Sequence, residues 1–141
     1  MKLLALFLLA SQSVGWAAEK VCVVSMTVPD YPPLARMARV QGSVRVEVEI
    51  DSTGKVVSAE PVYPPGAPKG LKLLGPHAAK NVSTWQFSVP TDEKTFPLRH
   101  SLTYVYKLYG KETYGFHCPT VTLHAADLLE IVTPPSATYR N

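Results

Sequence analysis

Residues 42–50 alternate strictly between apolar and polar side chains, and this pattern constrains the fold more than any other part of the chain. The apolar positions are Val44, Val46, Val48 and Ile50, and the positions between them are Ser43, Arg45, Glu47 and Glu49. Successive side chains of a strand point to opposite faces of a sheet, so a period of two predicts a strand with one buried and one solvated face.

A turn and two further β-like segments extend this strand into a sheet. The turn at residues 51–54 ends in Gly54 and joins the first strand to residues 55–63, which predicts a β-hairpin. Pro61 cannot donate to a strand ladder, so the return strand is expected at a sheet edge or at an irregularity. Residues 98–109 alternate again, and one face consists of Leu102, Tyr104, Tyr106 and Leu108.

Two short helices are predicted beside these strands. Pro33 suits the first position of a helix that continues to Val40, with Leu34, Met37 and Ala38 on one face and Arg36 and Arg39 pointing outward. A second helix is expected to begin near Pro76, because Leu74, Ala78, Val82 and Trp85 fall on one helical face.

These elements predict an α+β two-layer sandwich, in which two helices cover one face of an antiparallel sheet of three to four strands. Residues 21–28 form a leading β-like run. The tail after Gly110 contains a β-like run at residues 120–123 and an apolar run at residues 128–132, which we expect to form a C-terminal β tail.

Residues 1–17 are typical of a cleaved secretory signal peptide. Lys2 precedes an unbroken apolar run, and cleavage after Ala17 places Gly15 and Ala17 at the positions that must be small. Cleavage after Ala18 would place Trp16 at one of those positions. The alternative is a retained membrane anchor, but the apolar run is shorter than the ~20 residues that span a bilayer. We therefore expect an exported, periplasmic or secreted chain without a stable anchor.

The charge balance and the two cysteines narrow the classes of function. Basic residues number 14 against 11 acidic ones and are scattered, so no nucleic-acid partner is expected. In an exported chain Cys22 and Cys118 most simply form one disulfide, with two buried free thiols as the alternative. His117 beside Cys118 is the only local hint of a metal site, and two distant cysteines supply too few ligands. No metal and no cofactor are expected.

Catalytic motifs are absent from the sequence. The four histidines form no H-x-x-x-H pattern, and no G-x-S-x-G elbow, P-loop or G-x-G-x-x-G run occurs. Asp51 is explained by turn chemistry. The expectation is a protein that is not an enzyme, and a hydrolase assembled from distant residues is a minor alternative.

Two groups of residues recur at spacings that suggest a family. The first is Tyr31-Pro32-x-x-Ala35-Arg36, then Gly42-x-Val44, then Ile50-Asp51-x-x-Gly54-x-Val56; the second is Leu73-Leu74-x-x-x-Ala78-x-x-x-Val82-x-x-Trp85-x-Phe87. Together they resemble the C-terminal domain of TonB, the periplasmic energy-transducing protein. The resemblance covers about residues 31–109, which leaves a leading segment at 18–30 and an extension at 110–141. The motif and core residues are Tyr31, Pro32, Gly42, Gly54, Trp85 and Phe87.

The resemblance implies that the chain binds a protein or peptide partner in the cell envelope, with an outer-membrane transporter among the candidates. TonB domains add an extended peptide to an exposed sheet edge, where main-chain hydrogen bonds give affinity. Residues 98–109 match the family's last strand, so this strand is the candidate edge. Its candidate partner-binding residues are Arg99, His100, Ser101, Thr103, Val105 and Lys107. Ordinary solvated side chains are the alternative for any one of them.

The extension leaves two functions open. Without a retained anchor and a long spacer, force transduction from the inner membrane is not expected. If the tail pairs with residues 98–109, it covers the predicted edge, as proteins often do to protect exposed strands. The chain is then a structural accessory of an envelope assembly rather than a peptide receptor related to TonB-dependent transport.

Overall fold

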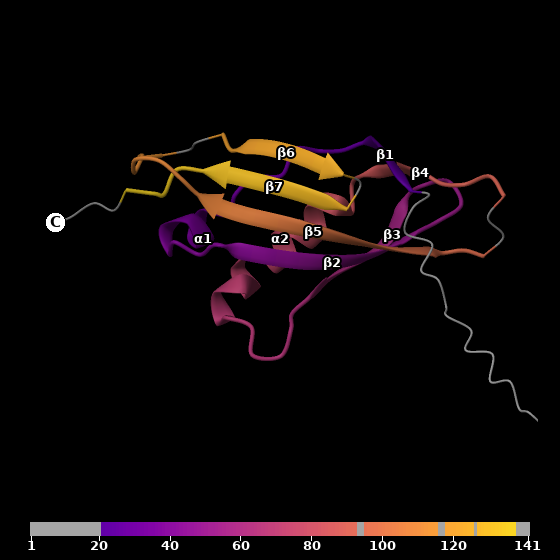
Figure 1. Cartoon of the computed structure of the whole chain (residues 1–141), viewed down its shortest axis with the longest axis horizontal. Coiled ribbons are helices and arrows are strands. Elements are labelled where there is room, and N and C mark those ends of the chain that lie inside the picture. The colour runs from indigo at the N-terminus through magenta and orange to yellow at the C-terminus, as the bar shows by residue number, and fades with distance from the viewer. Residues whose placement is uncertain (1–20, 93–94, 116–117, 126, 138–141) are drawn as a thin grey trace, which may run out of the picture.

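The computed structural model describes residues 21–92, 95–115, 118–125 and 127–137. The predicted signal peptide at residues 1–17 lies outside these ranges. The described chain is an α+β fold with two sheets and short helices (Figure 1). None of its described helices has the length and apolar character needed to cross a membrane.

The larger sheet has five strands in the order β3-β2-β5-β7-β6. Its strands are β2 (Gly42–Ile50), β3 (Val56–Val62), β5 (Leu98–Leu108), β6 (Thr120–Ala125) and β7 (Leu128–Thr133). Neighbouring strands are antiparallel except β5 and β7, which run parallel. In Figure 1 the yellow β7 lies between β5 and β6. The predicted antiparallel sheet of three to four strands is therefore wrong in size and direction, because both runs of the tail join it.

A second, two-stranded sheet consists of β1 (Cys22–Ser25) and β4 (Gln86–Ser88), which pair antiparallel. The leading run is thus a strand, although a shorter one than the sequence predicts. The Phe87 N–H of β4 donates to the carbonyl of Gly54 at 2.8 Å, which ties this sheet to the β2–β3 turn.

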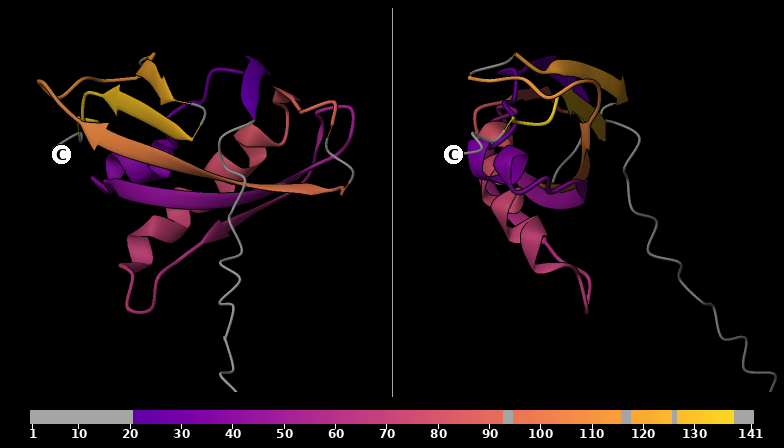
Figure 2. Two further views of the ribbon diagram at one scale, coloured as in Figure 1. Left: turned by 45° about the vertical axis from the view of Figure 1, so that its right-hand side comes forward. Right: turned by 90° about the vertical axis from the view of Figure 1, so that its left-hand side faces the viewer.

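In the part of the chain that the structure describes, three short helices accompany the sheets: α1 (Pro33–Met37), the 3₁₀ helix η1 (Lys69–Leu73) and α2 (Gly75–Val82). The start of α2 confirms the prediction near Pro76, whereas η1 was not predicted. The loop between β3 and η1 extends below the sheet in Figure 2, so that α2 returns alongside β3.

The alternating strands bury the predicted faces. Val44, Val46, Val48 and Ile50 of β2 and Leu102, Tyr104 and Tyr106 of β5 are at most 1% exposed. Against these strands pack three fully buried residues of α2 and the position before it: Leu74, Ala78 and Val82. The side chains of Trp85 and Phe87 are only 2% and 1% exposed. The prediction that these two aromatic residues are core anchors is confirmed. The other buried motif residues are Tyr31, Pro32 and Gly54, while Gly42 opens β2.

The predicted orientation of α1 is wrong. Leu34 and Met37 are 67% and 57% exposed, whereas Arg36 is only 7% exposed. With only five residues, α1 has little apolar surface of its own. It turns Ala35 and Arg36 inward because the guanidinium finds hydrogen-bond acceptors there.

The β2–β3 turn explains two motif residues. The Asp51 carboxylate accepts hydrogen bonds from the N–H groups of Thr53 and Lys55, at 2.9 and 3.1 Å. The pKa of Asp51 is lowered, first by the side-chain hydrogen bond from Thr53. Gly54 has a φ of +84°, and a Cβ there would stand 1.8 Å from the carbonyl oxygen of Phe87. This turn therefore requires glycine.

Candidate functional site

Both edges of β5 are occupied by strands. β2 pairs with it from Leu98 to Tyr106, and β7 pairs with it on the other side from Thr103 to Leu108. The outer edge that the family resemblance marks for peptide addition is therefore closed over the C-terminal half of β5. The occupant is the chain's own tail.

Three of the predicted partner-binding residues, Thr103, Val105 and Lys107, lie in the stretch that β7 covers. The Thr103 N–H donates to the carbonyl of Asp127 at 2.8 Å. Lys107 Nζ donates to Glu130 Oε2 at 2.7 Å, and this hydrogen bond is the first cause of the lowered pKa of Glu130. These residues therefore do not line an open edge, and the structure shows the alternative in which the tail pairs with their strand.

The other three predicted residues precede the β7 register. Arg99 and Ser101 are exposed, and Arg99 Nε lies 3.8 Å from Glu49 Oε1 on β2. His100 is only 6% exposed, and its ring meets Phe87 edge-on with centroids 5.8 Å apart. His100 is thus a core residue, and its predicted role as a partner contact is wrong.

Strand β7 buries its inward side chains as deeply as β2 and β5 do. Leu129 and Ile131 are fully buried and stand in register with Tyr104 and Tyr106 of β5. Thr133 is 1% exposed at the end of the strand. By contrast, β6 is exposed along most of its length and forms the outer edge. The tail therefore contributes one interior strand and one edge strand.

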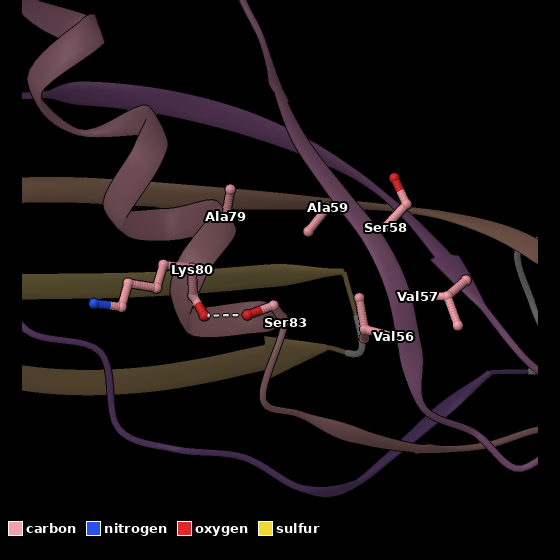
Figure 3. A pocket seen from close by; sticks show the side chains of 7 residues that line it. All are labelled: Val56, Val57, Ser58, Ala59, Ala79, Lys80 and Ser83. Atoms are coloured by element: carbon pink, nitrogen blue, oxygen red, sulfur yellow. Dashed lines mark hydrogen bonds between the residues drawn. The ribbon is translucent and has the colours of Figure 1, made fainter.

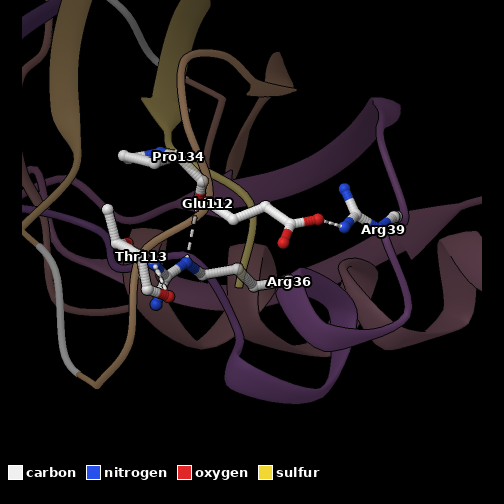
Figure 4. A network of polar contacts seen from close by, with 5 residues as sticks. All are labelled: Arg36, Arg39, Glu112, Thr113 and Pro134. Atoms are coloured by element: carbon white, nitrogen blue, oxygen red, sulfur yellow. Dashed lines mark hydrogen bonds and ion pairs between the residues drawn. The ribbon is translucent and has the colours of Figure 1, made fainter. Parts of the chain in front are cut away.

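Arg36 fastens the tail to α1 (Figure 4). Its Nε donates to the carbonyl of Pro134 at 2.7 Å, and one terminal nitrogen donates to the carbonyl of Gly115 at 2.8 Å. The other terminal nitrogen donates to the hydroxyl of Thr113. A buried guanidinium is costly unless its donors are satisfied, and here the tail satisfies them on two separate segments.

A second arginine of the same region makes a weaker link. Arg39 pairs with Glu112, and both side chains are about half exposed (Figure 4). Such exposed pairs contribute about 0–1 kcal/mol. Neither link was predicted, because the partners lie 73 to 98 residues away in the chain.

The tyrosines beside this region have structural roles. The Tyr31 hydroxyl donates to the carbonyl of Val40, and burial raises the pKa of Tyr31 to about 12. Tyr104 donates to Asn81 Oδ1 at 2.8 Å, and Trp85 Nε1 donates to the same oxygen at 3.0 Å. Burial also raises the pKa of Tyr104, so these hydroxyls stay neutral.

Cys22 and Cys118 are both free and exposed in the structure. The structure does not include the Cys22–Cys118 disulfide, which stays a prediction. Strand pairing, the buried side chains of β7 and Arg36 hold the tail in the structure.

Within the described ranges, no three His, Cys, Asp or Glu side chains gather as metal ligands. The alternative metal hint at His117 falls outside the described residues.

Residues 27–108 match the sequence profile of one family, described as the Gram-negative bacterial TonB protein C-terminal. No curated protein and no solved structure shows a significant match to the chain. The matched segment ends at the last residue of β5. Strands β6 and β7 thus lie outside it.

Proposed function

The chain belongs to the TonB C-terminal family, and on that basis we propose that it is an exported periplasmic accessory protein that binds a protein partner while its own tail closes the β5 edge. The family is an envelope-associated family of protein-interaction domains. The apolar run and small residues before residue 18 support export through a cleaved signal peptide.

The observation that carries this proposal is the parallel pairing of β7 along β5. Peptide addition to a sheet edge derives its affinity from main-chain hydrogen bonds. Over Thr103–Leu108 these groups already face β7. Any incoming peptide must therefore displace β7 or bind elsewhere.

Displacement of β7 is expensive. It would expose Leu129 and Ile131, which are fully buried, at about 2 kcal/mol for each side chain. It would also remove the Pro134 carbonyl from Arg36. A peptide must replace all of these contacts to compete, so the closed edge is favoured.

A second candidate function is strand addition at β5 in exchange for β7, related to TonB-dependent transport. The parallel β7 supports it, since the edge evidently accepts an extended segment from outside the matched core. The two candidates differ in whether β7 must leave when the partner binds.

A reversible covalent lock separates them. Val105 and Glu130 are register partners on β5 and β7, and neighbouring strands place Cα atoms within disulfide range. The double variant Val105→Cys/Glu130→Cys would be built with Cys22→Ser and Cys118→Ser, and partners would be captured from envelope extract with and without reductant. We expect the same partner in equal yield in both states.

The matched control places the lock where no exchange is proposed. Glu47 and Glu60 are register partners on β2 and β3, so Glu47→Cys/Glu60→Cys tests the effect of a cross-strand disulfide alone. Capture that is lost only in the oxidised β5–β7 lock, and restored by reductant, would replace the accessory function with strand exchange.

A further inference from the structure

Strand β6 (Thr120–Ala125) is an edge strand that the domain leaves uncovered. Among the described strands it pairs with β7 alone. Five of its six residues are exposed, and Val121 is half-buried. A free edge offers unpaired N–H and C=O groups to another strand, and proteins usually protect such edges with charges, proline or a bulge.

The opposite edge of the same sheet, β3, has these protections. It contains Pro61 and the exposed Glu60, and its pairing with β2 is irregular near Ile50. Helix α2 also lies beside it, where Ala79 and Lys80 line one side of a hollow of about 250 Å³ whose other side is β3 (Figure 3). These features disfavour the addition of a further strand at β3.

Strand β6 lacks these protections over residues 120–123. Its sequence, TVTLHA, contains no Lys, Arg, Asp, Glu or Pro, and its register with β7 shifts only after Leu123. Threonine and valine also fit well in strands. Because β6 is uncharged, an identical strand can approach it without placing like charges opposite each other.

The inner face of β6 continues the hydrophobic core to the edge of the sheet. Val121 is in register with Ile131, and Leu123 is in register with Leu129. Both of these β7 residues are fully buried. Opposed residues share a face of the sheet, so the core face reaches the outside at Leu123, which is 38% exposed. A further strand beside β6 would cover this end of the core.

The side-chain pattern of β6 is complementary to itself. A two-fold axis makes two identical edge strands antiparallel. With the axis at Thr122, each Val121 stands opposite Leu123 of the second copy on the inner face, and the two Thr122 side chains stand opposite each other on the outer face. Thr–Thr pairs stabilise antiparallel strands, and the aliphatic pairs bury apolar surface. A shift of two residues would set either Leu123 opposite Pro119 or Val121 opposite a small alanine.

We propose that β6 pairs antiparallel with β6 of a second copy of this chain, with the two-fold axis at Thr122, so that the two large sheets become continuous. The strand carries no charged side chain that could select a foreign strand, whereas its own pattern matches itself. One six-residue strand is a small contact beside the roughly 1,200–2,000 Å² of a standard interface, so the dimer dissociates reversibly. This pairing goes beyond the proposed function, since it uses neither the β5 edge nor an exchange of β7.

Sedimentation velocity of the purified exported protein over a concentration series measures the pairing. Reductant is present throughout, which excludes dimers linked through the exposed Cys22 or Cys118. We expect a reversible equilibrium between monomer and dimer. Thr122→Lys and Thr122→Glu each set two like charges opposite each other at the axis, and each should weaken the dimer at least about tenfold.

A mixture of the two variants separates direct pairing from a general effect of the substitution. Lysine and glutamate opposite each other attract, so an equimolar mixture of Thr122→Lys and Thr122→Glu should form a heterodimer at least about tenfold tighter than either variant alone. The matched control is Ser101→Lys on the interior strand β5. Ser101 is exposed on the same face of the sheet, and its register partner is a glutamate, as it is for Thr122. This control makes the same change in charge and should leave the dimer unaltered.

The inference is overturned if the protein is monomeric at every concentration, or if Thr122→Lys and Ser101→Lys weaken a dimer equally. It is also overturned if the mixture pairs no more tightly than the separate variants. These outcomes leave the proposed function standing, since its own test is the capture of a partner by the β5–β7 lock.

Discussion

The two neighbours of β5 hold it in different ways. β2 pairs antiparallel over nine residue pairs within the matched family segment. β7 pairs parallel over six residue pairs and comes from outside that segment. Two fully buried aliphatic side chains, Leu129 and Ile131, hold β7 against the core. Arg36 donates a hydrogen bond to the carbonyl of Pro134, just after the end of β7.

The difference shows that one short strand is enough to remove an edge at which a peptide could pair. A strand that buries Leu129 and Ile131 converts β5 from an edge strand into an interior strand. The new edge, β6, has a different sequence and no role in the family motif. Family membership therefore fixes the core of this protein more firmly than the place where it meets its partner.

The largest expected effect tests whether β5 and its neighbour β7 belong to one cooperative unit. Leu102→Ala on the β5 core face and Ile131→Ala on β7 each empty a fully buried site and should cost about 2–5 kcal/mol of unfolding free energy. We expect one transition in both variants, followed by circular dichroism and by Trp85 fluorescence in denaturant. If Ile131→Ala instead melts the tail while Trp85 unfolds as before, β7 is an independent element.

An intermediate effect is expected at the two arginines that join the tail to α1. Arg36→Leu removes buried charge-assisted hydrogen bonds to Pro134 and Gly115 and should cost about 2–3 kcal/mol. Arg39→Leu removes an exposed pair and should cost less than about 1 kcal/mol.

Amide hydrogen exchange shows which strands lose stability in Arg36→Leu. Faster exchange in β7 than in β2 would support a clamp that acts on the tail. Equal acceleration in both strands would show that Arg36 stabilises the whole domain instead.

The smallest effect concerns the ion pairs on either side of β5. The pKa of Glu130 is lowered by its hydrogen bond from Lys107, so this contribution is present above the unfolded pKa and is lost as pH falls through the folded value. Lys107→Gln should therefore flatten the acid side of the stability profile. Arg99→Gln, which removes the longer 3.8 Å contact to Glu49, should change it less. Equal profiles in both variants would contradict a specific role of the Lys107–Glu130 pair.

The sequence predicts the local elements of this fold well. Alternation identifies the buried faces of β2 and β5, because period two is a property of a single strand. Helical spacing likewise identifies the face of α2 that carries Ala78 and Val82. These patterns depend on neighbours in the chain, and the structure confirms them.

The candidate site is less predictable, because it depends on distant pairings. Nothing local to residues 128–132 specifies β5 rather than another strand as partner. The inward turn of Arg36 depends on acceptors 77 to 98 residues away. The one sequence signal for this pairing is the apolar run at Leu128–Val132. It indicates a buried strand but does not indicate which strand pairs with it.

The strand order has a consequence for how the sheet assembles. β7 follows β6 in the chain but lies between β6 and β5 in the sheet. Among the described strands β6 pairs with β7 alone, so it can join the sheet only once the segment that follows it in the chain has paired with β5.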